Sequence, residues 1–178
     1  MFIDEAEITI HGGDGGPGKV AFFVNKKGPC GGNGGKGGNV YFTLNSNVTD
    51  LKKFSEITLF KAENGQTGGS NRRVGRKGKD LYLPVPLNTT IIDNETKQNI
   101  TLTDTLLTTL ICRGGDGGFG NDFFKTSTHR TPRKATLGQK GEKKKVSLII
   151  KLIADIGLIG LPNAGKSSLL NMLTNAKY

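Results

Sequence analysis

The sequence predicts a mainly β fold, an all-β sandwich or roll with extended glycine-rich segments, followed by the first strand, phosphate-binding loop and helix of an α/β domain. Three observations predict it: short β-branched and aromatic runs, glycine in triplet blocks, and a G-x-x-x-x-G-K-S motif near the end of the 178 residues. Glycine supplies 27 residues and proline only 6. Collagen needs both in quantity and helices tolerate little glycine, so collagen and a helical bundle are both disfavoured.

Short apolar runs separated by turn residues are typical of a sandwich or roll. The polar sequence Asp93-Asn94-Glu95-Thr96 between two apolar ends predicts a hairpin over Ile91–Ile100. Pro84 and Pro86 predict an edge strand or a bulge, and Asp50–Phe54 is expected to form one helical turn. The eight expected strands are Ile8–Ile10, Val20–Val24, Val40–Leu44, Leu81–Val85, Thr89–Asp93, Gln98–Leu102, Leu106–Cys112 and Val146–Ile153.

Glycine is concentrated in three blocks, Gly12–Gly18, Gly31–Gly38 and Gly114–Gly120, which repeat Gly-Gly-X. Polyproline II has three residues per turn, so two of the three faces of each block would carry no side chain. We therefore expect extended, left-handed segments that pack against one another inside one domain. Flexible linkers are the alternative, and the threefold recurrence of the triplet argues against them.

The repeat also produces the G-x-G-x-x-G pattern of dinucleotide-binding loops in each block. Such a loop must connect a strand to a helix. No block is followed by a helical pattern, so none is expected to bind a dinucleotide.

Positive charge is concentrated near the end of the chain. The whole chain has a net charge of +10, and Arg113–Lys151 alone has ten Lys or Arg against three acids. A concentrated cationic field favours a polyanion such as nucleic acid, although a solvated basic face has the same composition.

Two stretches, Asn64–Lys79 and Lys125–Lys145, are expected to be exposed basic loops. Any single lysine there can serve solubility alone, but arginine-bearing loops on a rigid scaffold are typical of a binding surface. The candidate phosphate contacts are Lys26, Lys27, Arg72, Arg73, Arg76, Lys77, His129, Arg130, Arg133 and Lys134.

The two cysteines, Cys30 and Cys112, have no metal-ligand spacing around them and do not form a disulfide framework, so we expect reduced thiols. No apolar run reaches the roughly 20 residues of a membrane span. Acidic residues in Met1–Ile10 argue against a signal peptide. A soluble intracellular protein is expected.

The strongest chemical motif is Gly160–Ser167, which fits the phosphate-binding loop. An apolar strand, Ile156–Ile159, is expected before it and a helix with Leu169, Leu170 and Leu173 on one face after it. Lys166 would bridge the β and γ phosphates and the Ser167 hydroxyl would bind Mg²⁺. The alternative is a glycine turn that happens to precede a helix. The expected nucleotide-binding residues are Gly160, Leu161, Pro162, Asn163, Ala164, Gly165, Lys166, Ser167 and Ser168.

Eleven residues follow Ser167, whereas a nucleotide-binding domain needs on the order of 150. We therefore expect the chain to be a fragment, divided into residues 1–153 and 154–178, with no catalytic residue of its own and no appreciable nucleotide hydrolysis.

Together, Met1-Phe2-Ile3-Asp4, the three glycine blocks and IADIGLIGLPNAGKSSLLN resemble the Obg family of ribosome-associated GTPases over residues 1–178. The resemblance implies packed polyproline-type helices beside a small β sandwich, then a Ras-like GTPase domain. It also implies Mg²⁺, GTP and GDP, slow hydrolysis, a response to ppGpp, and links to stress and cell-cycle control. The implied partner is the large ribosomal subunit with its ribosomal RNA. The expected protein is a monomer in the bacterial cytoplasm or an organelle matrix.

Some positions depart from the family pattern. Phe22–Cys30 is short and has only two lysines, Asp116 stands where a basic residue is frequent, and Pro86-Leu87-Asn88-Thr89 stands where P-P-G-T is common. Two rival hypotheses stay open: a glycine-rich structural or protein-binding module with a non-functional nucleotide loop, and an adenine-specific ATPase.

Overall fold

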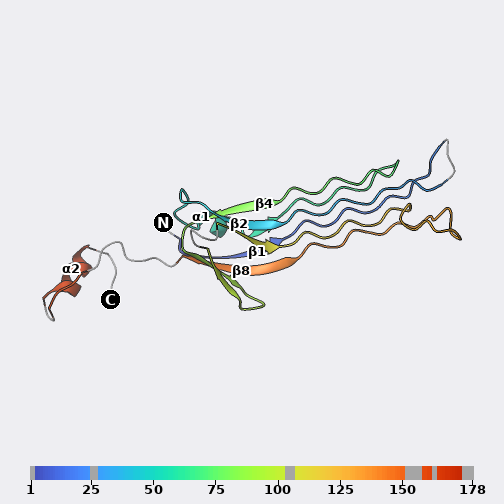
Figure 1. Ribbon diagram of the computed structural model, residues 1–178. Helices are drawn as coiled ribbons and strands as arrows, with labels where there is room; N and C mark the ends of the chain where they lie inside the picture. The colour runs from blue at the N-terminus through green and yellow to red at the C-terminus, as the bar shows by residue number, and fades with distance from the viewer. Residues whose placement is uncertain (1–2, 25–27, 103–106, 151–157, 162–163, 174–178) are drawn as a thin grey trace.

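The computed structural model describes residues 3–24, 28–102, 107–150, 158–161 and 164–173. Two β-sheets and one short helix form a sandwich, from which extended segments run in one direction (Figure 1). The first sheet has the order β3-β1-β8-β5-β6 and the second β4-β2-β7. The elements are β1 (Glu5–His11), β2 (Val40–Leu44), α1 (Lys52–Glu56), β3 (Leu59–Lys61), β4 (Leu81–Val85), β5 (Thr89–Asp93), β6 (Asn99–Thr101), β7 (Thr108–Cys112), β8 (Lys143–Ile150) and α2 (Lys166–Leu173).

Strand pairing mixes parallel and antiparallel ladders. β1 pairs antiparallel with β8 from Glu5 opposite Ile149 to His11 opposite Lys143, and parallel with β3. The expected hairpin is confirmed as β5 and β6. β4 lies at the edge of its sheet and contains Pro84, as the proline predicted.

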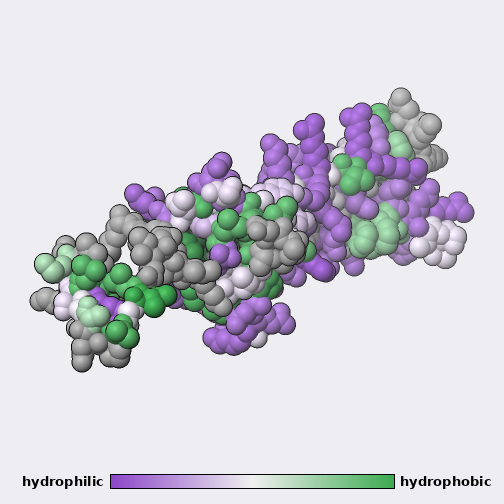
Figure 2. All heavy atoms as spheres, turned by 60° about the vertical axis from the view of Figure 1, so that its left-hand side comes forward, coloured by the Kyte–Doolittle hydropathy of each residue, from purple (hydrophilic) through white to green (hydrophobic). Residues whose placement is uncertain are grey.

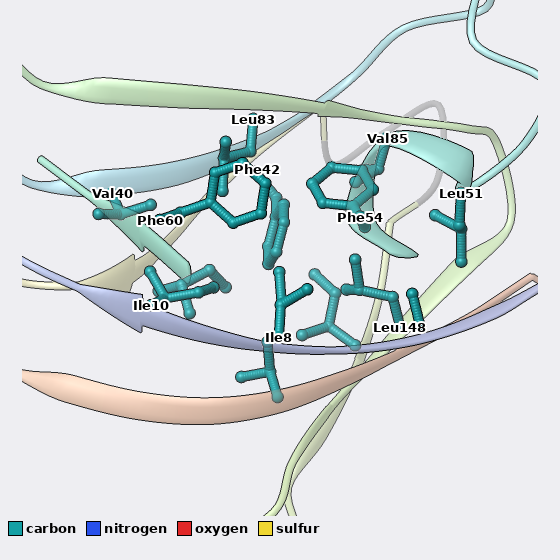
Figure 3. Close-up of a cluster of buried hydrophobic side chains, with 14 of the residues drawn as sticks. Ile8, Ile10, Val40, Phe42, Leu51, Phe54, Phe60, Leu83, Val85 and Leu148 are labelled. Carbon is teal, nitrogen blue, oxygen red and sulfur yellow. The ribbon is translucent and has the colours of Figure 1, made fainter. Parts of the chain in front are cut away.

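The core lies between the two sheets, where apolar side chains alternate with outward-facing ones (Figure 3). Ile8 and Ile10 of β1 are 1% and 0% exposed. Helix α1 adds Phe54, whose ring packs edge-on against Phe42 with centroids 6.2 Å apart and lies 5.5 Å from Phe60. Burial of each such side chain stabilises the fold by about 2 kcal/mol, so α1 forms because it covers one end of the core.

The extended segments are glycine-rich, and six of them lie side by side in the described part of the chain: residues 12–18, 31–38, 63–69, 73–79, 114–120 and 136–142. We call them the glycine bundle. Each one continues a strand of the sandwich. The chain therefore leaves the sandwich after β1, β3 and β7 and returns into β2, β4 and β8, making three long excursions (Figure 1).

Backbone hydrogen bonds with a period of three hold the bundle together. The N–H groups of Gly13 and Gly16 donate to Gly38 and Gly35 O at 2.9 and 2.8 Å. The N–H groups of residues 12, 15 and 18 donate to carbonyl oxygens of another segment, 136–142. This pattern confirms that the glycine blocks pack against one another, because linkers would leave these groups in water.

The space between segments admits no side chain at these glycines. A Cβ on Gly15 would overlap the carbonyl of Asp116, and one on Gly16 that of Gln66. The blocks 12–18 and 31–38 form backbone hydrogen bonds with four other segments each, and 114–120 forms them with three. The remaining segments have the sparser spacing Gly-x-x-Gly, at Gly65/Gly68, Gly75/Gly78 and Gly138/Gly141; 63–69 is bonded to three segments, and 73–79 and 136–142 to two each.

This arrangement corrects the prediction of two exposed loops. Most of Asn64–Lys79 and the end of Lys125–Lys145 are bundle segments with regular hydrogen bonds, and only their side chains point to solvent. These segments were not recognised in the sequence because they have only one glycine in every three residues.

Two strand predictions also differ from the structure. The prediction of a strand over Val20–Val24 was wrong. This run lies where the first excursion turns, and its β-pairing with other described residues is limited to the isolated bridge between Phe22 and Pro29. β3 was not predicted from the sequence, because three residues are too few to show the alternation of apolar and polar residues typical of a strand. Its pairing with β1 joins residues about 50 positions apart in the sequence.

After β8, the structure describes residues 158–161 and 164–173. Helix α2 follows the phosphate-loop motif as predicted. Leu158 and Ile159 belong to no described strand, and the rest of the strand expected there lies outside the described residues. Among the helices described, none has the length and apolar character needed to cross a membrane.

Candidate functional site

The described part of the loop before α2 has a backbone conformation at Gly165 that suits a phosphate-binding loop. Gly165 has φ of +75°, a left-handed conformation that glycine adopts at little cost. The N–H of Leu169 donates to Gly165 O at 2.9 Å, which starts the helix directly after this turn. Residues 164–168 line a hollow at the helix start, while Pro162 and Asn163 lie outside the described residues.

Lys166 bends back across this loop. Its Nζ donates hydrogen bonds to the carbonyl oxygens of Gly160 at 2.8 Å and Leu161 at 2.6 Å. The ammonium therefore lies over the loop, where phosphate oxygens could replace the two carbonyls as acceptors. The helix N-terminus adds a favourable field for an anion at this position.

Ser167 has the donor that Mg²⁺ prefers. Its side chain is exposed at the first turn of α2, and a hydroxyl oxygen is a hard ligand. Mg²⁺ at phosphate sites keeps several waters and takes few protein ligands. A single hydroxyl ligand therefore fits a Mg²⁺ that takes its other ligands from phosphates and water. Within the described ranges, no group of three or more His, Cys, Asp or Glu could hold a metal.

A second candidate site lies at the far end of the bundle, where the three excursions turn (Figure 1). We call residues 19–30, 70–73 and 121–135 the tip. The N–H of Arg72 donates to Cys30 O at 2.7 Å, and its guanidinium pairs with Asp122 at 2.9 Å and lies 5.8 Å from the centroid of Phe23. These contacts join all three turns into one surface.

The tip contains most of the net positive charge of the protein. By sequence it has nine lysines and arginines against one acid, Asp122, so it accounts for +8 of the net +10. The sequence alone did not show this concentration of charge, because the three contributing stretches are far apart along the chain. The cationic field therefore acts at one end of the molecule.

Asn121 fixes the tip from inside. It is fully buried, and its Oδ1 accepts from Gly31 N at 2.8 Å and Ala21 N at 3.3 Å. Its Nδ2 donates to the carbonyl oxygens of Ala21 and Pro132, both at 3.0 Å. One side chain thus connects the first and third turns of the tip.

The predicted contact residues divide into groups. Arg73, His129, Arg130, Arg133 and Lys134 are exposed at the tip. Lys134 lies 5.7 Å from the ring centroid of Phe124. Lys26 and Lys27 belong to the tip by sequence but lie outside the described residues.

Three of the predicted residues are placed differently. Arg72 is already paired with Asp122. Arg76 and Lys77 lie on the outer segment 73–79 rather than at the tip. Lys77 pairs with Asp80 at 2.8 Å, and this hydrogen bond raises the pKa of the lysine.

Sequence reasoning missed three notable residues, Phe119, Asn121 and Phe123. The two rings stack with centroids 4.1 Å apart and are 43% and 60% exposed. The signal was the run Gly-Asn-Asp-Phe-Phe inside a basic loop, because phenylalanine in a polar, charged loop has no core to occupy.

Comparison with known proteins gives consistent matches. The family model described as GTP1/OBG matches residues 3–152, and that described as 50S ribosome-binding GTPase matches residues 155–178. Proteins named GTPase Obg are similar over 99% of the chain: 48% identical in Persephonella marina, 45% in Psychrobacter sp. and 42% in Coprothermobacter proteolyticus. The alignments cover 53%, 45% and 43% of those proteins, so the chain spans about half of their length. The chain belongs to the GTP1/OBG family.

Proposed function

We propose that this chain is the docking and phosphate-binding part of a GTPase that hydrolyses GTP to GDP with Mg²⁺ and acts in assembly of the large ribosomal subunit. The tip contacts ribosomal RNA, and residues 160–168 hold the nucleotide. Residues 1–153 form the docking domain and residues 154–178 begin the GTPase domain. The proposal includes a cytoplasmic location, a response to ppGpp and links to stress and cell-cycle control.

The observation that carries the docking proposal is the convergence of three cationic turns on one rigid end of the molecule. A net charge of +8 over three loops attracts a polyanion strongly. The bundle holds these loops at a distance from the sandwich (Figure 1), which suits insertion into a recess of a large particle. The family description 50S ribosome-binding GTPase supports the large subunit as partner.

The nucleotide proposal depends on the loop before α2. The left-handed Gly165, the position of Lys166 over the loop and the Ser167 hydroxyl support phosphate and Mg²⁺ binding. The relatives named GTPase Obg support guanine as the base. The family matches end at residue 152 and begin at residue 155, which supports the proposed division.

Two double variants test docking. Arg73 and Arg133 are exposed at the tip and form no ion pair with another described residue, so Arg73→Ala with Arg133→Ala should weaken co-sedimentation with large subunits. The slope of log K against log[salt] should become shallower by roughly 1 to 2. Lys52→Ala with Lys53→Ala removes the same charge from α1, away from the tip, and should leave both quantities nearly unchanged.

Equal losses in the two variants would show a non-specific effect of net charge. Association that does not depend on salt would reject RNA contact and favour the protein-binding alternative.

Lys166→Ala tests the loop. We expect it to weaken binding of GTP and GDP at least tenfold in a titration with fluorescent nucleotide, because an unneutralised phosphate charge remains. Lys52→Ala is the matched control. Unchanged affinity in Lys166→Ala would contradict the assignment, and equal binding of ATP would favour the ATPase hypothesis.

A further inference from the structure

We propose that Phe119 and Phe123 form a stacking platform for an unpaired base of single-stranded RNA at the tip. This inference rests on the proposed docking to RNA and adds a contact that cations cannot provide. Phosphate contacts position a nucleic acid, whereas stacking selects bases that are not paired.

The platform is an exposed aromatic pair. The rings of Phe119 and Phe123 are stacked with an angle of 17° between their planes and centroids 4.1 Å apart. Phe124 meets Phe123 edge-on at 5.4 Å. Phe119 and Phe123 are 43% and 60% exposed, whereas Phe42 and Phe54 in the sandwich core are 0% and 1% exposed. The tip therefore presents ring surface to solvent that this fold buries elsewhere.

The backbone beneath the rings is fixed. The N–H of Phe119 donates to Thr136 Oγ1 at 2.7 Å, and its carbonyl accepts from Thr136 N at 2.9 Å. Phe123 lies in a turn closed by its own N–H to Gly120 O at 3.2 Å and anchored by buried Asn121. A base can thus stack on a preformed surface, and little ordering entropy opposes binding.

The surroundings identify the occupant. An exposed apolar patch alone fits many partners, but this one borders the tip, whose single acid, Asp122, is paired with Arg72. Asp116, which lines a hollow together with Phe119, is paired with Lys36 at 2.7 Å. Lys134 lies beside the ring of Phe124, and Arg133 is exposed on the same loop. Hydrophobic side chains occur among hydrophilic ones at this end of the molecule (Figure 2). Aromatic rings combined with cations are typical of surfaces that bind single strands.

The test measures binding of a short single-stranded oligoadenylate containing 2-aminopurine. Phe123→Ala should weaken binding by about 10-fold to 100-fold without changing the slope of log K against log[salt], because no charge is removed. Arg133→Ala should make that slope shallower by roughly 0.7. The parent should quench 2-aminopurine fluorescence through stacking.

Three further variants separate stacking from folding and from loss of apolar area. Phe123→Tyr keeps the π face and should restore parental affinity and quenching, whereas Phe123→Leu keeps apolar volume and should not. Leu137→Ala removes an exposed apolar side chain, 83% exposed, outside the aromatic pair, and should bind like the parent. The same oligomer in a duplex should bind the parent, the Phe123 variants and Leu137→Ala alike.

The outcomes are distinguishable. If Phe123→Ala binds within twofold of the parent while Arg133→Ala weakens binding, the platform is rejected and docking through phosphates stands. Full binding by Phe123→Leu likewise rejects stacking. If the parent binds neither oligomer nor ribosomal RNA, the proposed function and this inference both fail.

Discussion

Asn121 shows how one buried polar residue organises the tip. Its side chain makes four hydrogen bonds to backbone groups of the first and third turns. One of them is the N–H of buried Gly31, and leaving a buried group unpaired costs about 1–3 kcal/mol. Asn121 is therefore expected to determine tip geometry as well as stability.

Asn121→Ala should lower the free energy of unfolding by about 2–3 kcal/mol, because it leaves the N–H of Gly31 without its partner. Urea unfolding measures this loss. Asn47 is exposed, and Asn47→Ala should change stability by less than about 0.5 kcal/mol. A loss below that value in Asn121→Ala would contradict the role given to this side chain.

Cys112 gives a second prediction at the scale of one residue. Burial raises the pKa of its thiol from 9.0 to about 11. The unfolded chain then releases this proton above pH 9 while the folded chain keeps it, so stability falls between pH 9 and 11. Cys112→Ala should make this decline shallower, as measured by urea unfolding at several pH values. An unchanged decline would show that other groups cause it.

At the scale of elements, the glycine spacing is densest in the most enclosed segments. The two segments bonded to four others, 12–18 and 31–38, have two glycines per turn, and the two bonded to only two others, 73–79 and 136–142, have one. Segments 114–120 and 63–69 are each bonded to three others and have two and one glycines per turn, respectively. The reason is steric, since two faces of an enclosed segment meet backbone and leave no space for a side chain. The third position of the three blocks is occupied by Asp14, Pro17, Asn33, Lys36, Asp116 and Phe119, and the charged ones among these side chains contribute to the polar surface of the bundle.

Gly34→Ala should destabilise the protein by about 3 kcal/mol, the upper end for overpacking, because its Cβ would overlap the carbonyl of Gly16. Thermal unfolding tests this value. Gly160→Ala is the matched control: the nearest atom to its Cβ is 3.6 Å away, and the unfolding temperature should stay unchanged. Equal stability of both variants would disprove close packing at Gly34.

At the scale of the whole molecule, sandwich and bundle form one continuous hydrogen-bonded structure. Every strand that borders the bundle, such as β1 or β2, runs directly into a glycine segment, so one register governs both parts. This continuity transmits the rigidity of the core to a distant tip. A rigid arm keeps the cationic turns in a fixed relative position, which lowers the entropic cost of docking.

We expect the bundle and the sandwich to unfold together. Amide hydrogen exchange should show Gly13, Gly16 and Gly35 protected to a similar degree as Ile8 and Phe42 in β1 and β2, because their N–H groups are bonded inside the bundle. Val24 is 99% exposed at the tip and should exchange much faster. Glycine amides that exchange as fast as Val24 would indicate an independently mobile bundle.

Local patterns in the sequence determined much of this fold. β-branched runs predicted most strands, the triplet repeat predicted packed extended segments, and Gly160–Ser167 predicted the loop before α2. Asn88 has φ of 57°, a left-handed conformation that asparagine tolerates. Such features depend on neighbours within a few residues, so sequence alone reveals them.

The tertiary structure decided which residues meet. Sequence gave three glycine blocks where six segments pack, and it assigned a strand to Val20–Val24 because it could not show that this run has no partner strand. The cationic tip and the hydrogen bonds of buried Asn121 depend on turns far apart along the chain. Steric fit and hydrogen bonding between distant segments bring them together, and neither leaves a periodic signal in one stretch of sequence.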